Sequence, residues 1–233
     1  MKLKSEVKEK ENISKWTFIK KSHSTRRALF VALTLYTAAI FQGLVVVQVY
    51  AEPLFEEALP NMSSTLCSVL FAIVTVAAGC VAAYLIDATG RRTLMIFASI
   101  ASGVCCTMLG SQIHLHWGPH WITAVFIYLF CVTFTFGAGT VPFVLVAEVF
   151  LPEIKSLVSM VCMEWAWICN FVILFIFNPL VTLIGLGPVF YLFSTVCFGS
   201  AAFCYFFLPE TKGVPVDVIQ TLFAKKRIPL DSC

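Results

Sequence analysis

The sequence predicts an all-α membrane protein whose chain crosses the bilayer six times. Hydrophobic residues make up 59% of the 233 residues and charged residues only 12%, more apolar surface than one soluble core of this length can hide. Six apolar stretches reach or exceed the roughly 20 residues that a helix needs to cross the hydrocarbon layer. They are residues 28–50, 64–86, 93–114, 119–147, 156–179 and 186–208.

The positions of the basic residues predict the orientation. Nine of the sixteen Lys and Arg residues precede the first stretch, two lie in the second connection, one in the fourth, and four follow the last stretch. Because Lys and Arg favour short cytoplasmic segments, both ends of the chain are expected in the cytosol. We therefore expect a cytoplasmic segment over 1–27, a six-helix bundle over 28–208 and a cytoplasmic tail over 209–233, with outer connections near 51–63, 112–120 and 179–187.

The residue pattern gives no support to several other functions. It contains no nucleophile–base set, carboxylate pair or phosphate-binding glycine loop where water and substrate meet, so we do not expect an enzyme. No basic groove interleaved with aromatic residues indicates nucleic-acid binding. Apart from Cys67, near the outer end of the second stretch, and Cys233, the ten cysteines fall well within the apolar stretches, where they act as small apolar residues. We expect no cofactor and no metal site.

One modification signal lies on the predicted outer side. Asn61-Met62-Ser63 matches the acceptor sequence for N-glycosylation. The same residues directly precede the second apolar stretch, so a role in capping a helix is an equal alternative.

The fourth apolar stretch differs from a plain lipid-facing helix. It contains Gly137, Gly139 and Pro142, and proline removes a backbone donor and clashes with the preceding turn. The helix is expected to bend or unwind locally there. Because unpaired backbone at membrane depth needs protein or water around it, the segment either faces a cavity or forms a packing kink against a neighbour.

Two cytoplasmic connections carry charged patterns. Asp87 to Arg92 form a short turn with Gly90 in it, and Glu148 to Lys155 form the second connection. If Arg91 or Arg92 pairs with Glu148, the pair ties two helix ends together, and its breaking lets the cytoplasmic side open. The alternative is ordinary positive-inside topology with charges at helix ends.

These motifs and Pro209-Glu210-Thr211-Lys212-Gly213 after the last stretch, in this order and spacing, resemble the sugar-porter branch of the major facilitator superfamily and look nearest to facilitative glucose and insect trehalose transporters. The resemblance implies that the chain is the C-terminal six-helix half of a major facilitator fold and that residues 15–27 match the end of its central linker. The residues that carry it are Asp87, Gly90, Arg91, Arg92, Gly137, Gly139, Pro142, Glu148, Pro152, Lys155 and Pro209-Glu210-Thr211-Lys212-Gly213. The implied cytoplasmic gate comprises Asp87, Gly90, Arg91, Arg92, Glu148, Lys155 and Glu210.

The resemblance also implies a sugar pathway between two six-helix halves, with alternating access by their rocking. Relatives carry a glutamine pair, a serine and an asparagine on the first helix of this half. When Gly43 and Tyr50 are aligned with them, Ala39 and Ile40 replace the glutamine pair, Gln42 the serine and Val45 the asparagine. The candidate pathway residues are Gln42, Gln48, Tyr50, Thr140, Pro142, Phe143, Glu164, Trp167 and Asn170.

Glu164 is the unusual member of this set. If the fifth helix begins near Ile154, Glu164 lies roughly 15 Å into the membrane, close to the bilayer centre. A carboxylate at that depth is costly and is expected to face the bundle interior. It has either a proton-linked or substrate-contacting role, or it is a neutral acid buried in packing.

Two functions remain. The first is a hexose or trehalose transporter of the plasma membrane, of which this chain supplies one half and a missing N-terminal half the other. The second is a half-length membrane protein that transports nothing alone and associates with a full-length relative or with itself.

Overall fold

The computed structural model describes residues 17, 19–20, 22–58, 63–119, 121–215, 218–219 and 222. Most of the segment 1–27, the end of the tail and the acceptor residue Asn61 lie outside these described residues. Within them, the chain forms helices α2 to α10. They are α2 (His23–Phe41), α3 (Leu44–Val49), α4 (Ala51–Ala58), α5 (Ser64–Thr89), α6 (Arg91–Leu115), α7 (Trp121–Phe136), α8 (Val141–Val149), α9 (Pro152–Ile184) and α10 (Leu186–Phe207).

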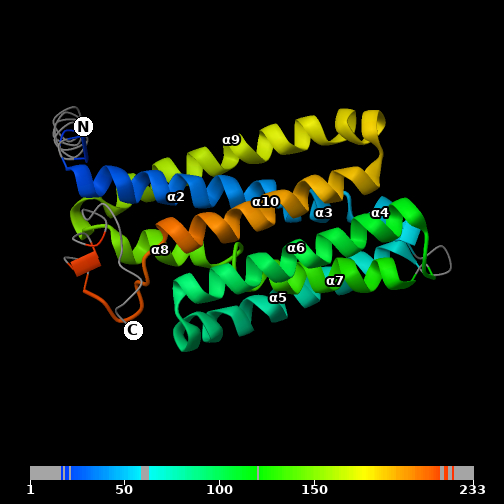
Figure 1. Cartoon of the computed structure of the whole chain (residues 1–233), viewed down its shortest axis with the longest axis horizontal. Coiled ribbons are helices and arrows are strands. Elements are labelled where there is room, and N and C mark those ends of the chain that lie inside the picture. The colour runs from blue at the N-terminus through cyan, green and yellow to red at the C-terminus, as the bar shows by residue number, and fades with distance from the viewer. Residues whose placement is uncertain are drawn as a thin grey trace, which may run out of the picture.

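Six helical segments are long and apolar enough to cross a membrane, as the sequence predicts. They are α2 continued by α3, then α5, α6, α7 continued by α8, α9 and α10. The six spans run antiparallel to their chain neighbours, and α2 begins at the same end of the bundle at which α8 and α10 end (Figure 1). The helical content and these six spans make the protein an integral membrane protein.

The predicted interruption of the fourth span is present. α7 ends at Phe136, four turn residues follow, and α8 begins at Val141. Pro142 lies in the first turn of α8, where its missing N–H costs no intrahelical hydrogen bond. A Cβ atom on Gly137 would lie 2.5 Å from the Cβ atom of Ala98 on α6. The glycine therefore allows the broken segment to pack directly against α6.

A second interruption, which the sequence analysis did not predict, divides the first span. Gly43 has φ 95° and separates α2 from α3. A Cβ atom at this position would lie 2.5 Å from Cδ2 of Phe193 on α10. The six spans divide into two sets of three, and the first span of each set, the first and the fourth overall, is thus discontinuous. Discontinuous helices at corresponding positions of two repeats are typical of transporter folds.

Several helix ends differ from the predicted ones. α2 begins at His23, because the Ser22 hydroxyl accepts a hydrogen bond from the Thr25 N–H at 3.3 Å and caps the helix. The connection predicted at 51–63 contains α4, and the one predicted at 179–187 is reduced to Gly185, with φ 84°, between α9 and α10. The length of an apolar stretch shows only how much of a helix crosses the hydrocarbon layer. A helix continues beyond that layer wherever its backbone hydrogen bonds continue.

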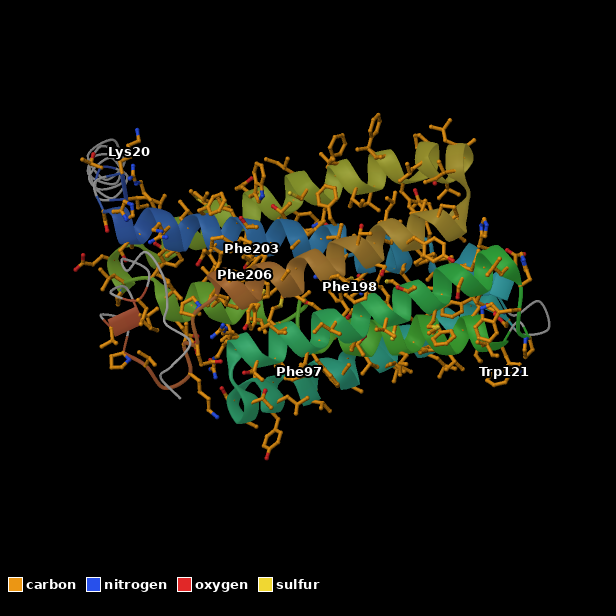
Figure 2. The ribbon with its side chains drawn as sticks, in the orientation of Figure 1. Lys20, Phe97, Trp121, Phe198, Phe203 and Phe206 are labelled. Atoms are coloured by element: carbon orange, nitrogen blue, oxygen red, sulfur yellow. The ribbon has the colours of Figure 1, made fainter. Side chains whose placement is uncertain are left out.

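Packing divides the six spans into a tight centre and two edges. α6 and α10 pack closely because small residues face each other: a Cβ atom on Gly110 would lie 3.0 Å from the backbone oxygen of Gly187. By contrast, only 22% of the apolar stretch of α5 and 17% of that of α9 is buried. These two helices lie along opposite edges of the bundle (Figure 1). Phe97 on α6 and Phe206 on α10 are exposed apolar side chains labelled in Figure 2.

We expect Gly43→Ala to lower the free energy of unfolding by about 2–4 kcal/mol, since a left-handed conformation costs a non-glycine residue about 1–2 kcal/mol and the added methyl group overlaps Phe193. Thermal unfolding of the purified protein, followed by circular dichroism, measures the effect. Gly79→Ala is the matched control, because nothing lies within 4 Å of a Cβ atom there. Equal melting temperatures for the two variants would contradict the role assigned to Gly43.

Candidate functional site

A cluster of charged side chains joins the helix ends at the end of the bundle where α6 begins, with Arg91 at its centre. Arg91 is the first residue of α6 and is only 8% exposed. Its Nε donates to Oε2 of Glu148 at 3.1 Å, and its Nη2 donates to Oε1 of the same carboxylate at 2.6 Å. Two parallel bonds to one carboxylate fix the planar guanidinium group in position.

Two further acceptors complete the surroundings of this guanidinium group. Nη1 of Arg91 donates to the backbone oxygen of Ile86 at 2.9 Å, and Nη2 also donates to Oδ1 of Asp87 at 2.9 Å. The side chain of Asp87 is 75% exposed, whereas that of Glu148 is 29% exposed. Because exposed ion pairs contribute little, Glu148 is the partner that offsets the burial of Arg91.

Glu210, in the segment that follows α10, caps the N-terminus of α6. Its Oε1 accepts a hydrogen bond from the Arg91 N–H at 2.9 Å, and its Oε2 accepts one from the Arg92 N–H at 3.1 Å. Oε1 also accepts hydrogen bonds from the N–H groups of Thr211 and Lys212. A carboxylate here satisfies backbone donors that lack a helical partner and neutralises the positive end of the helix dipole.

Gly90 is what permits this approach. Its φ of 94° and ψ of 156° lie in a region essentially restricted to glycine. A Cβ atom at Gly90 would lie 2.7 Å from Oε2 of Glu210. The glycine therefore satisfies two requirements at once, the turn between α5 and α6 and the space for the carboxylate.

Two further contacts bind the segment after α10 to the rest of the cluster, and Arg92 binds the last turn of α10 itself. The Thr211 hydroxyl donates to Oε2 of Glu148 at 3.1 Å, and Nζ of Lys212 donates to the backbone oxygen of Ala88 at 2.7 Å. Arg92 donates from Nη2 to the backbone oxygen of Tyr205 at 2.8 Å and lies over the ring of the same tyrosine. The turn from α5 to α6, the end of α8 and the segment after α10 are thus held together.

The structure brings together six of the seven predicted gate residues: Asp87, Gly90, Arg91, Arg92, Glu148 and Glu210. Of the two arginines considered for the pair with Glu148, Arg91 makes it. Lys155, in the first turn of α9, makes no ion pair within the part of the chain that the structure describes. The sequence analysis did not identify Thr211 as a member, although its position directly after Glu210 was the available signal.

The polar candidates of the pathway divide between buried and exposed positions. Gln42, next to the break at Gly43, is fully buried, and neither its amide nitrogen nor its amide oxygen has a hydrogen-bond partner among the described residues. Oδ1 of Asn170 is also buried without a partner there. Gln48, six residues after Gln42, is exposed. Buried amides without partners are rare in native structures and mark positions where a water molecule or ligand group fits.

The aromatic candidates lie where the two broken spans meet α9. Phe143 on α8 is 47% exposed and contacts the ring of Tyr36 edge-on, with the ring centroids 5.3 Å apart. The ring of Tyr50 packs on that of Phe177 of α9, with the ring centroids 4.9 Å apart. Trp167 on α9 is 72% exposed.

The two remaining candidates belong to the break in the fourth span. Pro142 is buried, and the Thr140 hydroxyl donates to the backbone oxygen of Thr135 at 2.7 Å. These contacts stabilise the interrupted backbone, so both residues shape the break itself.

The expectation that Glu164 faces the interior of this bundle is wrong. Glu164 is exposed and makes no hydrogen bond with the described residues. The buried residues of α9 that face the bundle include Cys162, Ala166 and Cys169, and Glu164 lies about 200° around the helix from Ala166. Because α9 lies at the edge of the unit, this outer face has no neighbour within the six helices.

The arrangement of six spans with breaks in the first and fourth defines the class of fold. The chain superposes on the major facilitator superfamily proton:xylose symporter XylE bound to 6-bromo-6-deoxy-D-glucose with a TM-score of 0.77 and 19% identity, covering 92% of this chain and 47% of that one. The inward-open structure of the xylose transporter XylE from E. coli gives a TM-score of 0.74 at 19% identity, over 84% of this chain and 42% of that one. The fold is one half of a major facilitator protein.

Residues 1–223 match the family described as "Sugar (and other) transporter", and the chain belongs to this family. It is 30% identical over 213 residues to Monosaccharide-sensing protein 2 of Arabidopsis thaliana, covering 85% of this chain and 29% of that protein. It is 24% identical over 199 residues to the facilitated trehalose transporter Tret1 of Bombyx mori, covering 83% of this chain and 39% of that protein. The chain thus spans less than half the length of these curated relatives.

The two acidic partners of Arg91 give a matched pair of variants. Glu148→Gln is expected to lower the free energy of unfolding by about 1–3 kcal/mol, because it leaves a buried guanidinium group without its main counter-charge. Asp87→Asn is expected to change it by at most about 0.5 kcal/mol, since that carboxylate is exposed. Thermal unfolding of the two variants compares them directly, and a larger loss for Asp87→Asn would overturn the assignment of Glu148 as the main partner.

Proposed function

We propose that this chain supplies the C-terminal six-helix half of a sugar transporter, which moves a hexose or trehalose by alternating access between two halves. The observation that carries the proposal is the pair of breaks, at Gly43 and at residues 137–140, in the first span of each three-span repeat. Interrupted helices at matching positions typically form the solute site of such transporters. Membership of the sugar transporter family and the trehalose and xylose transporters among its relatives support this reading.

The exposed edges of the unit support a requirement for a second half. The apolar stretches of α5 and α9 are mostly uncovered, and aromatic side chains such as Phe143 and Trp167 are exposed beside the broken spans. Aromatic rings offer apolar area to the faces of a sugar, and the exposed amide of Gln48 offers a donor and an acceptor to its hydroxyl groups. In the proposed transporter, a facing half covers these groups and encloses the solute.

The cluster around Arg91 is proposed as the latch of the cytoplasmic gate. Its contacts join the turn between α5 and α6, the end of α8 and the segment after α10. A charged cluster that persists in one conformation and loosens in the other biases the equilibrium between them. The position of the cluster agrees with cytoplasmic chain ends, since Arg26, Arg27 and Arg91 all lie at one end of the bundle. We place the complete transporter in the plasma membrane.

The second candidate is a half-length protein that transports nothing and associates with a full-length relative. The apolar residues Ala39, Ile40 and Val45 favour it, because they stand where similar transporters carry hydrogen-bonding groups. A site that lacks these groups recognises a polyol weakly.

Uptake into proteoliposomes tests the proposal. The chain reconstituted alone is expected to give no entry of labelled glucose or trehalose above empty liposomes, because one half encloses no pathway. A fusion that places the preceding part of the Bombyx mori trehalose transporter before this chain is expected to restore uptake of trehalose. Transport by the isolated chain would contradict the requirement for two halves. A fusion that folds and binds labelled trehalose without moving it would favour the second candidate.

A further inference from the structure

An apolar groove of about 720 Å³ lies between α2, α9 and α10. α2 forms one wall, α10 the other, and Trp165 of α9 closes one side. Figure 2 shows Phe203 on the part of α10 that runs beside α2. The volume falls within the range of pockets that hold small molecules. The lining residues on the two walls are Phe30, Leu33, Thr34, Thr37, Ala38, Phe41, Val196, Gly199, Ser200 and Phe203.

The groove is separate from the candidate sugar pathway. Its α2 residues, from Phe30 to Phe41, recur at helical spacing and therefore share one face of the helix. Tyr36, which contacts Phe143 on α8, lies on another face. On α9, Trp165 lines the groove, while Trp167 projects about 200° away around the helix. The two surfaces thus occupy opposite sides of the contact between α2 and α9.

One end of the groove is basic. A second hollow of about 270 Å³ is lined by His23, Arg26, Arg27, Val31 and Phe207 together with Phe30. Phe30 lines both hollows, so they adjoin along α2. The apolar groove is therefore continued, at the end where α2 begins and α10 ends, by a hollow that carries two arginines and a histidine.

The length of the groove matches one leaflet of a membrane. Measured from the basic end, the α2 wall extends about 16 Å from Phe30 to Phe41, and the α10 wall extends about as far in the same direction from Phe207 to Val196. Half of the hydrocarbon core of a bilayer is about 15 Å thick. The basic hollow then lies at headgroup level, and the groove ends near the bilayer midplane.

We propose that this groove binds a glycerophospholipid with an anionic headgroup, taken from the leaflet on the side of Arg26 and Arg27. The phosphate and the headgroup carboxylate lie in the basic hollow, and an acyl chain lies along the walls from Phe30 to Phe41. The charge of the hollow complements anionic lipids, which are enriched in the cytoplasmic leaflet. The proposal assumes that both chain ends lie in the cytosol, and it holds whether or not the protein transports a solute.

Three of the four polar side chains along the groove are compatible with an acyl chain, and the fourth, the buried Ser200 hydroxyl, has no partner among the described residues. The Thr34 and Thr37 hydroxyls donate to the backbone oxygens of Phe30 and Leu33, each at 2.8 Å. Nε1 of Trp165 donates to the Thr37 hydroxyl at 2.8 Å, which fixes the indole as the wall contributed by α9. These three groups already have partners, so a hydrocarbon chain leaves none of them unsatisfied.

Lipid binding to the purified full chain tests the proposal. The chain in detergent is titrated with dioleoyl phosphatidylserine and with dioleoyl phosphatidylcholine, and bound lipid is counted by native mass spectrometry. We expect the serine lipid to bind at least about tenfold more tightly, since each basic side chain at a headgroup favours an anionic lipid by several-fold. Equal affinity for the two lipids overturns the proposal.

Two sets of variants locate the site. Arg26→Gln combined with Arg27→Gln is expected to remove the preference for phosphatidylserine while binding of phosphatidylcholine persists. Gly199→Phe is expected to reduce binding of both lipids, because nothing lies within 4 Å of a Cβ atom at Gly199 and the ring fills the groove. Gly79→Phe, at an equally open position on α5, is the matched control and retains wild-type binding.

Three results would reject the assignment. The first is a phosphatidylserine preference that survives the double arginine variant. The second is wild-type lipid binding by Gly199→Phe. The third is a change in the fraction of dimeric protein, in either set of variants, while lipid binding stays unaltered. The last result identifies a second copy of the chain as the occupant. Because the arginine variant leaves the apolar walls of the groove unchanged, it keeps the test decisive even if the groove-filling variant folds poorly.

Discussion

The absence of water in the hydrocarbon layer constrains every other feature of this protein. Each backbone N–H and C=O group there needs a partner within the protein, so the chain is helical except where something else satisfies the backbone. The break at Gly43 is covered by the ring of Phe193, and the break in the fourth span packs on Ala98 and gains a bond from the Thr140 hydroxyl. Interruptions of this kind are confined to positions that protein covers, and those positions surround the proposed solute site.

At the helix ends, too, backbone N–H and C=O groups need hydrogen-bond partners, and charged side chains supply them. Glu210 accepts hydrogen bonds from the first backbone donors of α6, and Arg91 bonds the backbone oxygen of Ile86 near the end of α5. The carboxylate of Glu148 then balances the buried guanidinium group. Because each member satisfies a neighbour, removing one leaves another uncompensated. Such mutual dependence would give the proposed latch two discrete states, formed and broken, with few stable arrangements between them.

The helices of this half-unit separate three environments. The broken spans and Phe143 lie on one side of the contact between α2 and α9, and the groove with a basic end lies on the other. The edges formed by α5 and α9 are mostly uncovered. If a second half covers the first side and lipid occupies the groove, α2 contacts both solute and membrane. A lipid bound along α2 then has a direct mechanical connection to the helix that breaks at Gly43.

The resemblance of the charged motifs to a family singled out the charges that meet around Arg91, and the sequence by itself determined the six spans and the interruption of the fourth span. Hydropathy, proline and glycine act locally, so these features can be predicted without knowing the neighbours. Tertiary structure alone decided the break at Gly43, the choice of Arg91 over Arg92 as the partner of Glu148, the separation of Lys155 and the exposure of Glu164. Each depends on which distant segment lies alongside: Phe193 on α10 fixes Gly43, and the edge position of α9 leaves Glu164 uncovered. Contacts between residues far apart in sequence leave no periodic signal in the chain, because they are set by how the helices pack.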